Sequence, residues 1–177
     1  MNIKVMSRNE AIAHSFKQEI PKCAIVSINA LLENHPSFYM HNNIEDRRIM
    51  GVLKLNFNDI DKPFENMEPK QEDLLGLKAF IDTIKDNPEI EEIIVHCAAG
   101  ISRSSAVAAA ICQYLGLDEF KIIWSSYNYV PNTLVYKLAI NELGLKWDEA
   151  QFAYYLAMNK LERDKMEIPS DINDMFE

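Results

Sequence analysis

The sequence predicts one α/β domain, with a central mixed, mainly parallel sheet of four to five strands flanked by helices. Segments with helical spacing first separate and then follow short apolar runs, an order that builds a small α/β sandwich. Hydrophobic side chains make up 48% of the 177 residues, enough for one sizeable core. The runs typical of strands are Ile3–Met6, Ala24–Ile28, Val52–Phe57 and Ile93–His96.

Helical spacing of apolar side chains predicts the remaining elements. Between the last two strands, Glu68–Asp86 repeats apolar residues at helical spacing and stops at Asn87-Pro88. Ser104–Leu115 is apolar on nearly every side, and Gly116 follows where a helix commonly ends in a left-handed glycine. Further helices are predicted near Asp118–Tyr127, Pro131–Leu143 and Asp148–Leu161.

The domain is predicted to span residues 1–163, followed by an acidic tail over 164–177. From Glu162 onward six acids stand against two bases, and we expect this end to fray. The helix before it has more apolar side chains than one buried stripe needs. Core packing is the favoured explanation, and a homodimer or partner face is the alternative. The segment Asn34–Arg48 fits either a rim that contacts substrate or a plain surface loop.

Composition argues against several classes of protein. A net charge of −9 disfavours nucleic acids and anionic membranes as partners. No run of eighteen apolar residues occurs, and Met1–Arg8 lacks the apolar segment of a signal peptide. Three cysteines do not suit a disulfide scaffold, so the cytoplasm is the expected location. No histidine has metal-binding spacing, and neither metal nor cofactor is expected.

The most informative stretch is His96-Cys97-Ala98-Ala99-Gly100-Ile101-Ser102-Arg103-Ser104. Chance would produce its pattern of His-Cys, Gly and Arg-Ser/Thr in about one chain of this length in fifty thousand. The stretch leaves a predicted strand and enters a predicted helix, so several backbone N–H groups and the helix dipole converge on one point. Gly100 permits a positive φ or the close approach of a ligand. We therefore predict a nest for a tetrahedral dianion.

Each polar side chain of this loop has an expected task. Cys97 lies at the floor of the nest, where the donors that bind phosphate also lower a thiol pKa. Arg103 can grip two phosphate oxygens at once, and Ser104 can donate to the sulfur. His96 points away from Cys97 along the strand and is expected to orient the loop. A buried core cysteine or a helix-start ion pair would explain Cys97 or Arg103 alone, but not both in this register.

The other two cysteines are expected to have a structural role. Cys23 heads an apolar strand and Cys112 lies on the apolar helix, so core packing is favoured over a redox partnership with Cys97.

The loop resembles the phosphate-binding loop of the cysteine-dependent protein tyrosine phosphatases, specifically the small dual-specificity, bacterial-type enzymes. Val130-Pro131-Asn132 resembles the Pro-Asn helix start of that family, and Leu53–Ile60 resembles the strand and loop that supply its general acid. The similarity spans roughly Ile25 to Gly144. It implies a phosphatase-like sandwich fold, phosphate binding by Ala98, Ala99, Gly100, Ile101, Ser102 and Arg103, and a supporting role for Asn132.

A carboxylic acid must protonate the leaving oxygen of a phosphate ester. Asp59 and Asp61 both follow the strand Val52–Phe57, where a lid would begin. The resemblance favours Asp59, because the family's acid is usually an aspartate followed by an apolar residue. Asp61 is the alternative, and whichever is not the acid is expected to cap a turn before Pro63.

The predicted activity is phosphomonoester hydrolysis through a phosphocysteine on a phosphorylated protein or peptide. Phosphotyrosine is the favoured substrate, with dual specificity open, and the lack of extra basic residues in the loop favours a singly phosphorylated group. A catalytically weak phosphate-binding or adaptor module and a phosphatase of a small metabolite are the alternatives. Arsenate reductases and low-molecular-weight phosphatases share the Cys–Arg spacing but carry it near the N-terminus, which disfavours them.

Overall fold

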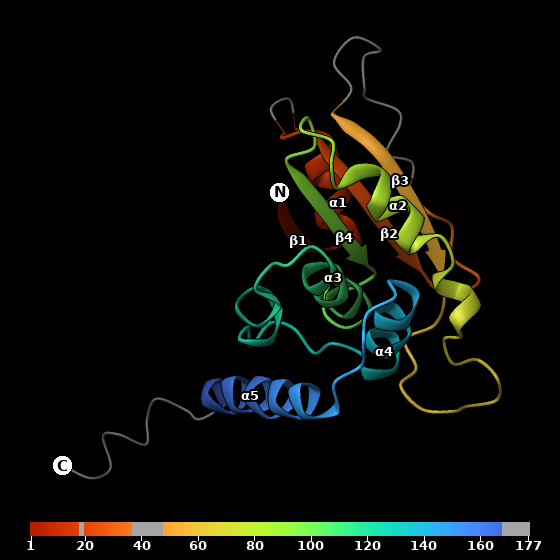
Figure 1. Ribbon diagram of the computed structural model, residues 1–177. Coiled ribbons are helices and arrows are strands. Elements are labelled where there is room, and N and C mark those ends of the chain that lie inside the picture. The colour runs from red at the N-terminus through yellow and green to blue at the C-terminus, as the bar shows by residue number, and fades with distance from the viewer. Residues whose placement is uncertain (18–19, 37–47, 168–177) are drawn as a thin grey trace.

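A four-stranded parallel sheet forms the centre of the protein, as the computed structural model of residues 1–17, 20–36 and 48–167 shows (Figure 1). The strands run in the order β1-β4-β2-β3, and each adjacent pair is parallel. This confirms the predicted α/β class, although no antiparallel strand joins the described part of the sheet. The strands are β1 (Asn2–Ser7), β2 (Cys23–Asn29), β3 (Ile49–Asn56) and β4 (Glu92–Cys97).

Helices cover both faces of this sheet. On β4, Ile93, Val95 and Cys97 face the larger core, whereas Ile94 faces the smaller core that contains Ala11. The larger core is closed by α2 (Leu77–Ile84), α3 (Arg103–Tyr114) and α4 (Thr133–Glu142), and the smaller one by α1 (Arg8–Ser15). Because β4 alternates between the two cores, His96 and Cys97 project to opposite sides, as predicted.

The prediction of one continuous helix over Glu68–Asp86 is wrong. The segment contains a 3₁₀ turn, η1 (Gln71–Leu74), and then α2, which begins after Gly76. Gly76 has φ +88°, a left-handed conformation that interrupts helical hydrogen bonding. The apolar spacing is nevertheless real, since Leu74, Leu77 and Ile81 are all buried in the larger core.

Two further elements differ from prediction. Helix α1 was not predicted; Ser7 and Glu10 cap it reciprocally in a capping box. Helix α5 (Glu149–Glu167) continues past the predicted domain boundary at 163, and the fraying expected from Glu162 stays a prediction. The rest of the acidic tail, 168–177, and most of the predicted rim segment, 37–47, lie outside the described residues.

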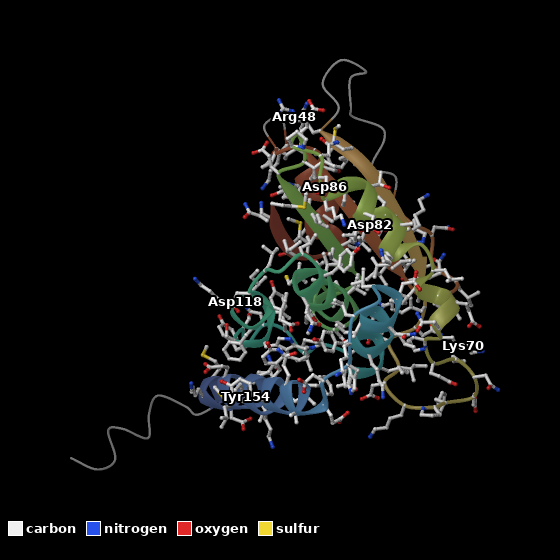
Figure 2. The ribbon with its side chains drawn as sticks, viewed as in Figure 1. Arg48, Lys70, Asp82, Asp86, Asp118 and Tyr154 are labelled. Carbon is white, nitrogen blue, oxygen red and sulfur yellow. The ribbon has the colours of Figure 1, made fainter. Side chains whose placement is uncertain are left out.

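One face of α5, together with the short π-helix η2 (Phe120–Trp124), packs against the larger core. Trp124 is fully buried, and its ring packs against Tyr136, Phe152 and Tyr155 at centroid distances of 5.3, 6.1 and 5.6 Å. This face of α5 therefore belongs to the core. Tyr154, labelled on α5 in Figure 2, stacks against Phe120 at 5.8 Å but is 55% exposed, and the homodimer or partner face stays a prediction.

Candidate active site

The loop between β4 and α3 wraps tightly against the start of α1. Gly100 lies at the middle of this loop and has φ +75°, the positive φ that was predicted as one possibility. A Cβ at this position would lie 2.4 Å from the backbone nitrogen of Ser7. The loop can therefore pass over the end of β1 only with glycine here. Ala98, Ala99 and Ile101 face solvent and Ser102 is half-buried, so the rim of the loop is open.

The Cys97 sulfur lies at the base of this loop, where the side chain is 2% exposed. It lies 3.1 Å from Ser104 Oγ and accepts a hydrogen bond of 3.3 Å from the Gly100 N–H. Burial, the largest single influence, raises the pKa of this thiol. Hydrogen bonds from Ser104 and Gly100, together with the charge of Arg103, outweigh burial and lower the pKa below its ordinary value. A lowered thiol pKa is what a nucleophilic cysteine needs.

Cys23 and Cys112 provide a comparison within the same chain. Both are buried and free, as predicted for core cysteines. Burial, reinforced by the charges of Glu92 at Cys23 and of Glu119 and Asp118 at Cys112, raises the pKa of each thiol to about 12. Among the three cysteines, only Cys97 therefore has surroundings that favour the thiolate.

The guanidinium of Arg103 is buried at the first position of α3. Its Nη1 donates to the backbone oxygen of Phe57 at 2.9 Å, which ties the arginine to the end of β3. Its Nε is buried and makes no hydrogen bond within the described part of the chain. A buried N–H without an acceptor is costly, and a phosphate oxygen would satisfy it.

Asp59 reaches the same place from the segment after β3. Its Oδ1 accepts hydrogen bonds from Ser102 Oγ at 2.8 Å and from Asn132 Nδ2 at 2.9 Å. Its Oδ2 lies 3.8 Å from Arg103 Nε. Because Oδ1 is occupied by two donors, a proton on this carboxyl belongs on Oδ2, the oxygen nearer Arg103.

Asn132 connects this acid to α4. Its Nδ2 binds Asp59, while its Oδ1 accepts from the Val135 N–H at 3.0 Å and so caps the helix. One side chain thus fixes both the start of α4 and the orientation of the carboxyl.

Asp61 is the alternative acid. It lines a surface pocket of about 410 Å³ with Asp59, Asn132 and Arg163. Within the described ranges it forms neither a hydrogen bond nor an ion pair, unlike Asp59. Contacts with Ser102 and Arg103 therefore link Asp59, rather than Asp61, to the loop.

His96 lies beneath the loop and is fully buried. Burial lowers its pKa to about 4, so the ring is neutral at physiological pH. A neutral, buried ring on the far face of β4 suits the predicted orienting role better than proton exchange.

Three residues beside the loop, Arg8, Asn29 and Glu33, belong to no sequence motif and were not predicted. Arg8 N donates to the backbone oxygen of Ala98 at 3.2 Å, and its guanidinium contacts Asn29 and Glu33. They come from the ends of β1 and β2, which the parallel sheet brings to the edge where Cys97 lies. The rule that ligands bind at the carboxyl ends of parallel strands was the available signal.

The described residues contain no group of three His, Cys, Asp or Glu side chains arranged to hold a metal ion. In the same ranges, no helix has the length and apolar character needed to cross a bilayer.

Neither a protein-family model nor a curated protein matches the chain. Among solved structures, the chain is similar to a crystal structure of Tk-PTP in the active form, with 15% sequence identity and a TM-score of 0.39. The similarity covers 93% of each chain. A likeness at this identity and TM-score leaves the family open.

Proposed function

We propose that this chain is a phosphomonoester hydrolase that acts through a phosphocysteine at Cys97. The observation that carries the proposal is a buried sulfur with a lowered pKa in a strand-to-helix loop, beside an arginine whose buried Nε makes no hydrogen bond to any described residue. A thiolate and a planar cation at one point are the two groups needed to attack and hold a phosphoryl group. Neither a metal nor an organic cofactor enters the proposed reaction.

In the first step the Cys97 thiolate attacks phosphorus, and an S–P bond forms as the ester P–O bond breaks. Arg103 and the N–H groups of the loop stabilise charge on the equatorial oxygens. Asp59 gives its proton from Oδ2 to the leaving oxygen, which departs as an alcohol or phenol.

In the second step water attacks the phosphocysteine. The Asp59 carboxylate accepts the proton of the water, the S–P bond breaks, and inorganic phosphate is released. Ser104 donates a hydrogen bond to the departing sulfur, which lies 3.1 Å from its hydroxyl. The acid used in the first step is thereby regenerated as a protonated carboxyl.

A phosphorylated protein or peptide, with phosphotyrosine favoured, is the proposed substrate. The support is the loop itself: Ala98, Ala99 and Ile101 add no positive charge at its rim, which suits a singly phosphorylated group. An aryl ester also leaves more readily than an alkyl ester.

The test is hydrolysis of an aryl phosphate in the presence of chelator and reductant, with Cys97→Ser, Asp59→Asn and Asp61→Asn variants beside the wild type. We expect metal-independent turnover that Cys97→Ser abolishes, and a larger loss of kcat for Asp59→Asn than for Asp61→Asn. Turnover that survives Cys97→Ser would refute the phosphocysteine. Phosphate binding without turnover in the wild type would instead identify a binding module.

A further inference from the structure

A second arginine stands next to the phosphate loop at the ends of β1 and β2. The Arg8 backbone N–H donates to Ala98 within the loop, which fixes where its side chain starts. Its Nη2 donates to Asn29 Oδ1 at 3.4 Å and forms an ion pair with Glu33 Oε2. The guanidinium therefore lies beside the site of the proposed chemistry, and the reaction steps above do not use it.

Glu33 supplies a carboxylate to this position from the turn after β2. Its Oε2 accepts from the Ala30 N–H at 3.2 Å as well as from Arg8. The Ala30 N–H has the largest effect in lowering the pKa of Glu33, followed by Arg8, and the charge of Arg103 contributes as well. An anion held here thus interacts with a backbone N–H and with two arginines, one of which belongs to the phosphate loop.

The cluster of Arg8, Asn29 and Glu33 contains donors without acceptors among the described residues. Arg8 Nε and Asn29 Nδ2 are both buried and find no acceptor among the described residues. Asn29 is itself fully buried, so its amide cannot turn to water. Glu33 therefore leaves two donors of this cluster without an acceptor among the described residues.

The position is also open to solvent. The side chains of Arg8 and Glu33 are 27% and 39% exposed to solvent. An exposed ion pair holds its partners weakly, because water competes for both charges. A ligand carboxylate can therefore replace Glu33 without unfolding the turn.

We propose that Arg8 and the Ala30 N–H form a second acid-binding subsite, which the chain fills with its own Glu33 and which accepts a carboxylate next to the phosphorylated residue of a substrate peptide. The proposed ligand is a carboxylate because the carboxylate of Glu33 already occupies the position. The inference rests on the proposed phosphatase activity, since the subsite serves a substrate whose phosphate lies at Cys97. Glu33 is then an internal competitor that limits the preference for acidic peptides.

The experiment compares two phosphotyrosyl peptides that differ only in carrying glutamate or glutamine on both sides of the phosphotyrosine. The ratio of their kcat/KM values is measured for the wild type, Glu33→Gln and Arg8→Gln. Removing the competing carboxylate is expected to raise the preference for the glutamate peptide about tenfold in Glu33→Gln, the size of one charge-assisted contact. Arg8→Gln is expected to abolish the preference.

Glu89→Gln is the matched control, because Glu89 pairs with Lys22 at the opposite end of the sheet, at 2.8 Å. It should leave the ratio at the wild-type value. If Arg8 and Glu33 only tie the turn to α1, Glu33→Gln lowers the unfolding temperature and leaves the ratio unchanged, which overturns the subsite. Because Glu33→Gln is nearly isosteric, this arm is decisive even if Arg8→Gln misfolds.

An aryl phosphate assayed in the same preparations distinguishes failure of the subsite from failure of the proposed phosphatase activity. If the wild type hydrolyses the aryl phosphate and the ratio stays near one in every variant, the subsite is wrong and the phosphatase stands. If the wild type hydrolyses none of the three compounds, the proposed activity fails, and the subsite falls with it.

Discussion

Replacing Ser104 with alanine should make the Cys97 thiol markedly less acidic. The Ser104 hydroxyl lies 3.1 Å from the sulfur, and its hydrogen bond contributes more than any other group to lowering this pKa. A hydrogen bond to a charged group contributes about 1.5–3 kcal/mol, and one pKa unit corresponds to about 1.4 kcal/mol. We therefore expect the thiolate to lose about 1.5–3 kcal/mol of stabilisation and the thiol pKa to rise.

The assay is the rate of alkylation of Cys97 by iodoacetamide as a function of pH. Only the thiolate reacts, so the midpoint of the rate profile reports the pKa. In the wild type the reactive form persists to lower pH; in Ser104→Ala the whole profile should move to higher pH. Cys23 and Cys112 have pKa values near 12 and are buried, so they contribute little.

Ser105→Ala is the matched control for this measurement. Ser105 is the next residue of the same helix turn and equally buried, but its hydroxyl donates to the backbone oxygens of Ile101 and Ser102 and not to the sulfur. Its alkylation midpoint should stay at the wild-type value. Unchanged midpoints in both variants would refute the argument that the Ser104 hydroxyl stabilises the thiolate.

Three further changes test other parts of the account. Gly100→Ala places a Cβ 2.4 Å from the Ser7 nitrogen at a positive φ, and should lower the free energy of unfolding in urea by about 2 kcal/mol or more; a smaller loss would contradict the tight loop. Asn132→Asp keeps the cap of α4 but sets a second carboxylate against Asp59, so kcat should fall about tenfold in protein that remains folded. An unchanged kcat would remove Asn132 from the positioning of the acid. Burial, outweighing hydrogen bonds from Tyr136 and Trp124, raises the pKa of Glu119, so the folded state binds its proton more tightly and stability falls as pH rises above the ordinary value of 4.5. Glu119→Gln should flatten that fall in urea unfolding measured across pH, whereas parallel curves would contradict it.

The two central strands, β2 and β4, were predictable because each is a short apolar run buried on both faces. Ile93–His96 and Ala24–Ile28 read in this way, and the structure extends each by only one residue at either end. Helix α1 was missed because it buries only Ala11, so its sequence carries almost no apolar period. The break at Gly76 was missed because apolar spacing continues through it, from Leu74 to Ile81, while the backbone does not.

The loop from Cys97 to Arg103 could be predicted because its donors are close in sequence. Asp59 and Asn132 are 73 residues apart, and only the folded chain places them 2.9 Å from one another. Arg8, Asn29 and Glu33 share no spacing that chemistry would recognise. Their meeting depends on strand order, since β4 lies between β1 and β2, and no local pattern specifies that order.

The central claim is a covalent phosphoryl group on Cys97, and rapid acid quenching during turnover tests it most directly. Mass spectrometry of peptides from the quenched wild type and Asp59→Asn should find one phosphoryl group on Cys97, absent from Cys97→Ser. Asp59→Asn should alter its yield, because Asp59 assists both formation and hydrolysis of the intermediate. Turnover of an aryl phosphate with no phosphoryl group on Cys97, or with the group on another residue, would contradict the account.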